Sequence, residues 1–455
     1  MKFPVFFLAG TMAAAVSVPE ASALPLFARQ TGTACSLCHF QHFPKLNGFG
    51  RSFKSAGYTM MGGQAKVEGE SLSIPNTLNM AVLTTAGYER SNQATASTLG
   101  TTPAKTPGDG VFYVPASGGE LSLFFGGRLS ENAGFLGELS AGDAVGGAHS
   151  SAKMPIQHDM SSLLSSVLEG TRAIVVPFAT DAQGASYGFE LLNTGANAVQ
   201  QMSSTTGMNG AHSGAISAQQ YIGTNGAAKG VALVLSNPMG YINLTKFDRT
   251  GIAGGALTSF DSTYLRVAGI FELAGWDVAA GAQMWSGSSA AANPDPLTAT
   301  ASPLVIAETK AAAIDGQMQG YIGEMPVGFY ISYATAPAVA AAGASLGNAY
   351  NTYRNNLGVV TNGTVAKRSI NVSGEVGVIP DKATLGAAVR YGKSGDGNTD
   401  NAFMLIGTYK LAQNMLASLS YTSASGNYWY SNAAGTGTTD TIGNKTYTFN
   451  LFTAF

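Results

Sequence analysis

The stretch YTFNLFTAF, residues 447–455, ends the chain and alternates as a β-strand does. Residues two apart lie on the same face of a strand. One face of this stretch therefore carries Tyr447, Phe449, Leu451, Thr453 and the final Phe455. The pattern predicts a terminal strand with one apolar face, which occurs in the wall of a membrane barrel and also in the core of other β-proteins.

Similar runs recur upstream, and they are joined by links of two kinds. Clear examples of the runs are ELSLFFGGRL (120–129), RAIVVPFAT (172–180), TYLRVAGIFEL (263–273), ATLGAAVRYG (383–392) and NMLASLSYTS (414–423). Short links fall at 130–134, 181–184, 224–228, 274–275, 324–326, 379–381 and 412–413. Longer links rich in Gly, Ser, Thr and Asn fall near 92–118, 143–171, 195–217, 237–262, 286–307, 337–366, 393–400 and 425–444. We predict sixteen strands, with YINLTKF (241–247) counted inside a loop; a count of 14 or 18 is the alternative.

An even number of antiparallel strands, joined alternately by short turns and long loops, is typical of bacterial outer-membrane barrels. The terminal strand that finishes in Phe455 resembles the last strand of such barrels. A soluble β-sandwich is the alternative, but one sandwich rarely needs so many strands. We therefore predict an all-β fold, a transmembrane antiparallel β-barrel of about 16 strands over residues 71–455.

The N-terminus has the organisation of a secretory signal peptide. Lys2 precedes the apolar run FPVFFLAGTMAAAV, and Ala21-Ser22-Ala23 matches a cleavage site. A retained membrane anchor is the alternative, but the apolar run is too short to span a bilayer. We expect residues 1–23 to be removed and the mature chain to start near Leu24.

The chain's only two cysteines stand in CSLCH, as Cys35, Cys38 and His39. The spacing C-x-x-C-H is typical of covalent c-type haem attachment. The two thiols would form thioethers with the haem vinyl groups, and the imidazole of His39 would be the proximal iron ligand. A thioredoxin-like redox pair, half of a zinc site and a simple disulfide are the alternatives.

The sixth iron ligand is less clearly marked than the fifth. His42 lies three residues after His39, so on a helix both rings would project from one face. We therefore expect His42 to make a polar contact near the haem rather than to bind its distal side. Met60 or Met61 lies far enough along the chain to fold back over the iron and is our candidate distal ligand. Core or pore-lining methionines are the alternative.

The segment 24–70 has roughly 47 residues, too few to bury a haem with a core of its own. A sixteen-stranded barrel encloses a lumen, and we expect this small helical and loop segment to plug or cap it. We place the haem in the lumen or at the periplasmic mouth.

The stretch LPLFARQTGTACSLCHFQHFPKLNGFGRSFKSAGY, residues 24–58, resembles the haem segment of outer-membrane monohaem cytochrome c–porin fusions. These are the Fe(II) oxidases of iron-oxidising bacteria. The resemblance implies one haem c held by Cys35, Cys38 and His39. It also implies extracellular Fe(II) as donor, a periplasmic carrier such as a cytochrome c or copper protein as acceptor, and iron:cytochrome c oxidoreductase activity. Residues 71–455 resemble the family only in length, strand rhythm and the terminal Phe.

Two other functions compete with Fe(II) oxidation. One is a passive porin with a structural haem plug, and the other is an outward conduit that reduces external metals. A formal net charge of -2 gives no reason to expect a nucleic-acid partner. His149, His158 and Asp159 share the 143–171 link and could bind iron, although ordinary polar loop residues are the simpler interpretation.

Overall fold

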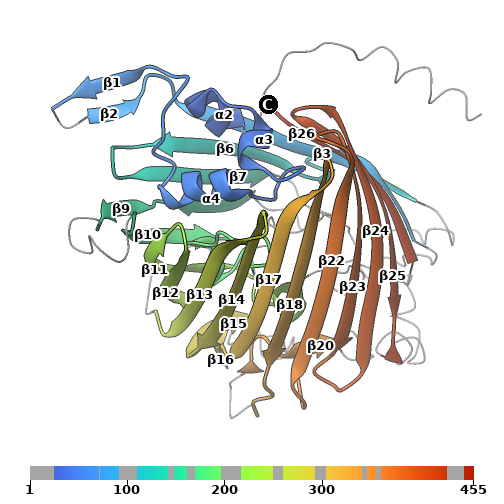
Figure 1. The fold of residues 1–455 in the computed structure, drawn as a ribbon. Coiled ribbons are helices and arrows are strands. Elements are labelled where there is room, and N and C mark those ends of the chain that lie inside the picture. The colour runs from blue at the N-terminus through green and yellow to red at the C-terminus, as the bar shows by residue number, and fades with distance from the viewer. Residues whose placement is uncertain are drawn as a thin grey trace, which may run out of the picture.

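A closed antiparallel β-barrel forms most of the chain (Figure 1). The computed structural model describes residues 25–70, 72–91, 110–141, 148–160, 170–195, 217–249, 260–292, 304–340, 346–354, 360–427 and 445–455. The expected signal peptide lies outside them. Among the described residues, no helix is long and apolar enough to cross a membrane.

The barrel wall has sixteen positions, with β8 and β9 sharing one, and closes where β26 pairs antiparallel with β3. Its strands are β3 (Asn79–Ser91), β6 (Leu121–Arg128), β7 (Gly134–Ala141), β8 (Ala148–Lys153), β9 (Ile156–Asp159), β10 (Arg172–Thr180), β11 (Ala228–Asn237), β12 (Gly240–Asp248), β13 (Ser262–Leu273), β14 (Trp276–Ser286), β17 (Ala311–Ile322), β18 (Met325–Ala336), β22 (Lys367–Ile379), β23 (Ala383–Lys393), β24 (Thr399–Ala412), β25 (Met415–Ser425) and β26 (Lys445–Ala454). The predicted fold and strand number are confirmed.

The correct total conceals two pairs of errors in the predicted strands. The predicted links imply strands over 185–194 and 218–223, yet the chain there forms η1 (Ala185–Tyr187), irregular backbone and α6 (Ala218–Tyr221). Conversely, the predicted loops 143–171 and 237–262 contain β8 with β9 and β12. The two surplus strands and the two missed ones cancel. The connection from β10 to β11 is therefore one long excursion, not a pair of strands.

The two ends of the barrel differ in their connections. One end carries tight turns, such as Ala274-Gly275 between β13 and β14, where both residues have positive φ. A two-residue turn of that kind matches the twist of the strands it joins. The other end carries long connections with small elements: β4 (Val111–Pro115), β5 (Gly118–Gly119), β15 (Ser288–Ala292), β16 (Leu304–Glu308), β19 (Leu346–Asn348), β20 (Thr352–Arg354) and β21 (Val360–Asn362). We call these the short-turn end and the long-loop end.

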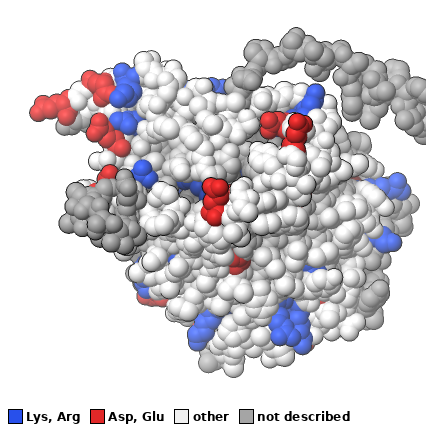
Figure 2. Space-filling view, viewed as in Figure 1, with Lys and Arg blue, Asp and Glu red and all other residues white. Residues whose placement is uncertain are grey.

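The wall is polar inside and apolar outside. On β12, Asn243 and Thr245 are 0% exposed, whereas Ile242 and Leu244 between them are 48% and 42% exposed. Charged side chains are sparse over the middle of the visible wall; they lie near the β1–β2 hairpin at one end and along the lower and right-hand edges of the view (Figure 2). This distribution suits a wall that faces lipid. The chain is a porin-like barrel of the outer-membrane kind.

The described parts of the excursion between β10 and β11 pack inside the barrel. These parts, residues 181–195 and 217–227, are here called the lumen segment. Tyr187, Phe189, Leu192 and Tyr221 are each at most 3% exposed, and they pack against inward-facing side chains of the wall. The apolar core of this protein therefore lies inside the barrel.

Residues 25–63, here called the plug, lie across the short-turn end (Figure 1). The plug contains α2 (Pro25–Thr31), α3 (Cys35–Cys38) and α4 (Gly48–Ser55), and a hairpin of β1 (Lys66–Gly69) and β2 (Leu72–Pro75) leads from it to β3. Asn47 caps α4 by accepting a hydrogen bond from the Gly50 N–H at 3.0 Å.

We predict that Leu405→Lys destabilises the barrel by about 2–4 kcal/mol, because Leu405 is 47% exposed at the middle of β24 and the charge would enter lipid. Urea unfolding in lipid vesicles measures this loss. Val365→Lys is the control, since Val365 is 39% exposed near the long-loop end. Equal stability of the two variants would contradict a lipid-facing β24.

Candidate functional site

The C-x-x-C-H motif forms a single helical turn followed by extended backbone. Cys35 and Cys38 are the first and last residues of α3, so their side chains share one face of the turn. The two cysteines are not joined in a disulfide; Cys35 is buried and Cys38 is partly exposed. Burial raises the pKa of Cys38 to about 11. Two thiols on one face of a helical turn suit attachment to two vinyl groups.

Helix α4 packs directly on this turn. A Cβ added at Gly50 would lie 2.2 Å from the backbone oxygen of Cys38. The position therefore accepts only glycine without movement of one helix. Gly48, two residues earlier on α4, has room for a side chain. Its added Cβ would meet nothing closer than Asp277 Oδ2 at 3.5 Å.

The ring of His39 is oriented by a backbone carbonyl. Its Nδ1 lies 2.9 Å from the oxygen of Lys45, and its ring packs edge-on against Phe43 at 5.4 Å between centroids. When Nδ1 carries the proton and donates to this carbonyl, the lone pair is on Nε2. Metal-binding histidines are commonly held in this way. Burial lowers the pKa of His39 to about 4, although the hydrogen bond to Lys45 acts in the opposite direction.

A small hollow lies between the plug and the barrel wall. The plug contributes Cys35, Ser36, His39, His42 and Phe43, and the wall contributes Lys410, Gln413, Asn414, Phe452 and Ala454. The free volume is about 30 Å³, room for about one water. The donor set fits a c-type haem: thiols on one turn and an oriented imidazole. A macrocycle would need the seam between plug and wall to widen.

His42 is tied to the wall of the barrel. Its Nε2 lies 2.9 Å from Glu375 Oε2 on β22, and its Nδ1 lies 2.7 Å from the Phe43 oxygen. Because both nitrogens face acceptor oxygens, neither is directed at the hollow as a ligand. This geometry agrees with a polar contact near the site rather than a distal ligand.

Lys45 shares the same carboxylate, 3.2 Å from Glu375 Oε1, and its ammonium lies 3.4 Å from the centroid of the Tyr330 ring. The Tyr330 hydroxyl donates to Glu375 Oε1 at 3.1 Å. Burial lowers the pKa of Lys45 to about 8, and the attraction of Glu375 opposes this shift. We call His42, Lys45, Tyr330 and Glu375 the latch. All are buried, so the latch joins plug to wall away from water.

Other contacts hold the plug around the mouth. The Arg128 N–H donates to Gln30 Oε1 at 3.0 Å beside β6, and Arg51 forms an ion pair with Asp277 on β14. The Leu46 N–H donates to Asn193 Oδ1 at 2.8 Å, which connects the plug to the lumen segment. The plug is therefore anchored to the wall on several sides and to the material inside it.

Met60 and Met61 lie elsewhere on the plug. The Met60 oxygen accepts a hydrogen bond from Gln30 Nε2 at 2.8 Å, and the neighbouring Thr59 oxygen accepts from Arg128 at 3.1 Å. Neither methionine lines the hollow beside His39. The assignment of Met60 or Met61 as distal ligand stays a prediction, and it requires the segment after α4 to move.

The iron-binding candidates of the 143–171 link lie on strands. His149 is in β8, and His158 and Asp159 are in β9, where both are exposed. Throughout the part of the chain that the structure describes, no group of three His, Cys, Asp or Glu side chains could hold a metal ion. These residues therefore gain no support as an iron site.

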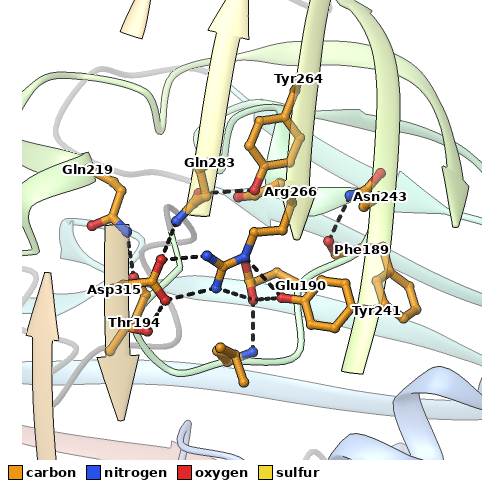
Figure 3. Close-up of polar contacts among 12 residues, drawn as sticks. Phe189, Glu190, Thr194, Gln219, Tyr241, Asn243, Tyr264, Arg266, Gln283 and Asp315 are labelled. Carbon is orange, nitrogen blue, oxygen red and sulfur yellow. Dashed lines mark hydrogen bonds and ion pairs between the residues drawn. The ribbon is translucent and has the colours of Figure 1, made fainter. Parts of the chain in front are cut away.

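A buried ion network fixes the lumen segment (Figure 3). Arg266 on β13 pairs with Asp315 on β17, at 2.9 Å between Nη2 and Oδ1, and with Glu190 of the lumen segment, at 3.2 Å between Nε and Oε2. Glu190 also accepts from the Tyr241 hydroxyl, and Gln283 donates to Asp315 at 2.8 Å. Arg266, Glu190 and Asp315 are enclosed by protein, so each charge depends on the others.

The chain was compared with known proteins. No family model matches it, and no curated protein matches it. Among solved structures it is similar to OmpT of Vibrio cholerae (8% identity, 86% of this chain and 100% of that one, TM-score 0.43) and to the channel DcaP of Acinetobacter baumannii (9%, 86% and 100%, TM-score 0.44). It is also similar to OmpF of Salmonella typhi in complex with daunomycin (8%, 86% and 100%, TM-score 0.45).

Gly50→Ala tests the contact between α3 and α4. The added methyl overlaps the Cys38 carbonyl, so we expect a loss of about 1–3 kcal/mol in local stability. Amide hydrogen exchange of residues 33–47 should become faster. Gly48→Ala is the matched control on the same helix and should leave exchange unchanged. Equal exchange in both variants would show that the contact is not required.

Glu375→Gln tests the latch. The substitution leaves the buried Lys45 without a counter-charge, which costs about 3–5 kcal/mol for a buried pair. We expect the plug to become sensitive to protease while the barrel stays folded. Glu68→Gln breaks only the exposed pair with Lys66 and should not change cleavage. A plug as resistant as the unmodified one would exclude the latch as its main anchor.

Proposed function

We propose that the chain is an outer-membrane electron conduit that oxidises extracellular Fe(II), an iron:cytochrome c oxidoreductase with one covalent haem c. The electrons would pass to a periplasmic carrier, a cytochrome c or a copper protein. The observation that carries the proposal is the C-x-x-C-H turn at one mouth of a transmembrane barrel, with His39 Nδ1 held 2.9 Å from the Lys45 oxygen.

A bound haem would supply a one-electron redox centre. The residues of the chain have separate tasks around it. Cys35 and Cys38 would hold it covalently, and His39 would offer Nε2 to the iron. Phe43 and Phe452, stacked at 5.1 Å between centroids, form an apolar wall beside the hollow. Such a wall keeps water from the metal, and solvent exposure is one of the factors that set a haem potential.

The barrel supplies the path through lipid. Hydrocarbon excludes ions, so an external donor needs a protein-lined route to a redox centre at the short-turn end. The lumen segment packs against the inside of the wall through aromatic and ion-paired side chains, and the plug lies across the short-turn end. Both obstruct the route of diffusing solutes, which favours a conduit over an open pore. Oxidation of Fe(II) by electron loss needs no acid–base group at the site.

Two alternatives are separated by simple measurements. A passive porin with a structural haem plug is compatible with the barrel, and it would show high single-channel conductance with the plug in place. An outward conduit that reduces external metals would have the same architecture. A low reduction potential of the haem would favour that direction, and a high one would favour Fe(II) oxidation.

The test is reduction of the purified protein by Fe(II), followed in the visible spectrum of the haem. We expect haem reduction in the unmodified protein and no covalent haem in the double variant Cys35→Ala, Cys38→Ala. That variant should still form a heat-modifiable barrel, because neither cysteine belongs to the wall. Covalent haem in the double variant, or a haem that Fe(II) never reduces, would refute the proposal.

A further inference from the structure

The wall of the barrel beside the hollow has an irregular strand pairing. β24 and β25 shift register between Lys410 and Ala412, next to the turn Gln413-Asn414. A bulge of this kind leaves one residue unpaired and redirects neighbouring side chains, often beside functional sites. Here it lies at the hollow, which Lys410, Gln413 and Asn414 all line. The Cys35 thiol also approaches this turn, 3.6 Å from the Gln413 oxygen.

These three side chains are suited to binding a carboxylate. An ammonium and two amides supply hydrogen-bond donors, and a charged donor makes the strongest hydrogen bonds to a carboxylate. Among the described residues, no carboxylate lies within 4.0 Å of the Lys410 ammonium. The side-chain oxygen of Gln413 is buried without a hydrogen-bond partner, and reversal of the amide would present its NH₂ group there instead.

The other side of the hollow is apolar. Phe43 and Phe452 stack, and Ala454 lies beside them. The hollow thus combines an aromatic surface, an oriented imidazole and a cluster of carboxylate-binding donors. A haem has the matching chemistry, because its ring is flat and apolar and its two propionates are carboxylates.

We propose that Lys410, with the amides of Gln413 and Asn414, binds a haem propionate. The inference rests on the haem of the proposed function, but not on Fe(II) as the donor. The cofactor is then bonded to the plug through Cys35 and Cys38 and held to the barrel by an ion pair. The ammonium also favours the reduced haem, whose iron carries one positive charge fewer, and so raises the reduction potential.

The nearest protein carboxylate offers a competing partner. Asp381 lies on the neighbouring turn between β22 and β23, and its charge acts on Lys410 although no ion pair forms between them in the structure. Removal of Asp381 removes a negative charge and shifts the potential upward whichever partner Lys410 has. The propionate itself therefore decides between the partners: its vibrations change on removal of Lys410 only if Lys410 binds it.

The experiment measures the midpoint potential of the purified, haem-loaded protein by spectroelectrochemical titration. We expect a downward shift for Lys410→Ala, partial recovery for Lys410→Arg and no shift for Lys382→Ala. Lys382 is the matched control, a neighbouring lysine at the same end that does not line the hollow. The propionate bending bands in resonance Raman spectra should change with Lys410→Ala alone.

Covalent haem and a heat-modifiable barrel are confirmed first for each protein. Absence of covalent haem in the unmodified protein would refute the proposed function itself. Unchanged potential and Raman bands in Lys410→Ala would overturn the propionate site and leave the haem in place. A lowered potential with unchanged propionate bands in Lys410→Ala would also overturn it, by assigning Lys410 to a partner other than the propionate.

Discussion

The satisfaction of every backbone hydrogen bond in lipid is the constraint on which this structure depends. Hydrocarbon offers no water to a free N–H or carbonyl group, so a sheet survives there only when it closes. The pairing of β26 with β3 completes that closure and brings the last strand beside the first. Closure then creates an interior that is separated from lipid; the lumen segment packs inside it and the plug lies across its mouth.

That interior has charges that a soluble core rarely contains. Arg266 with Glu190 and Asp315, and Glu375 with Lys45, are paired within the wall and enclosed by protein. A buried ion pair adds little net stability compared with apolar packing, but removal of one partner is costly. In both clusters the partners come from different parts of the chain: the wall and the lumen segment in one, the wall and the plug in the other. The main effect of these ion pairs is to fix where the lumen segment and the plug lie, because each is paired only in one position against the wall.

The sequence alone predicted the wall better than its contents. Alternation with period two identifies strands, and it gave the barrel and its short turns. The same criterion wrongly predicted a strand over residues 185–194. These residues lie inside the barrel and are buried against the wall, so none of their side chains faces lipid. The prediction also placed 241–247 inside a loop, although this stretch alternates regularly and lies in β12. Local pattern cannot distinguish a strand in the wall from an irregular segment packed against it.

In the site, too, the sequence reveals local features and misses partners that are distant along the chain. Cys35, Cys38 and His39 were recognisable because their spacing is local. Glu375 is 333 residues from His42 in sequence, and the hydrogen bond between them leaves no trace in the motif. Lys410 is an ordinary inward-facing residue until the plug is seen beside it. Partners of this kind could be found from sequence only as polar residues on the inward face near a short turn, a description that fits many side chains.

The plug explains why the motif and the barrel belong to one chain. A segment of this size cannot enclose a large cofactor, and here its contacts with β6, β14, β22 and the β24–β25 turn replace the missing core. Those contacts lie around the mouth rather than on one side of it, so the orientation of α3 is fixed relative to the whole barrel. A redox group bonded to α3 would then lie at a fixed distance from the lumen on one side. It would lie at a fixed distance from a docked carrier on the other side. Electron transfer depends steeply on such distances, whereas diffusion through a pore does not. If the plug carries the proposed haem, the contacts that fix the plug would therefore also fix the distances over which electrons move.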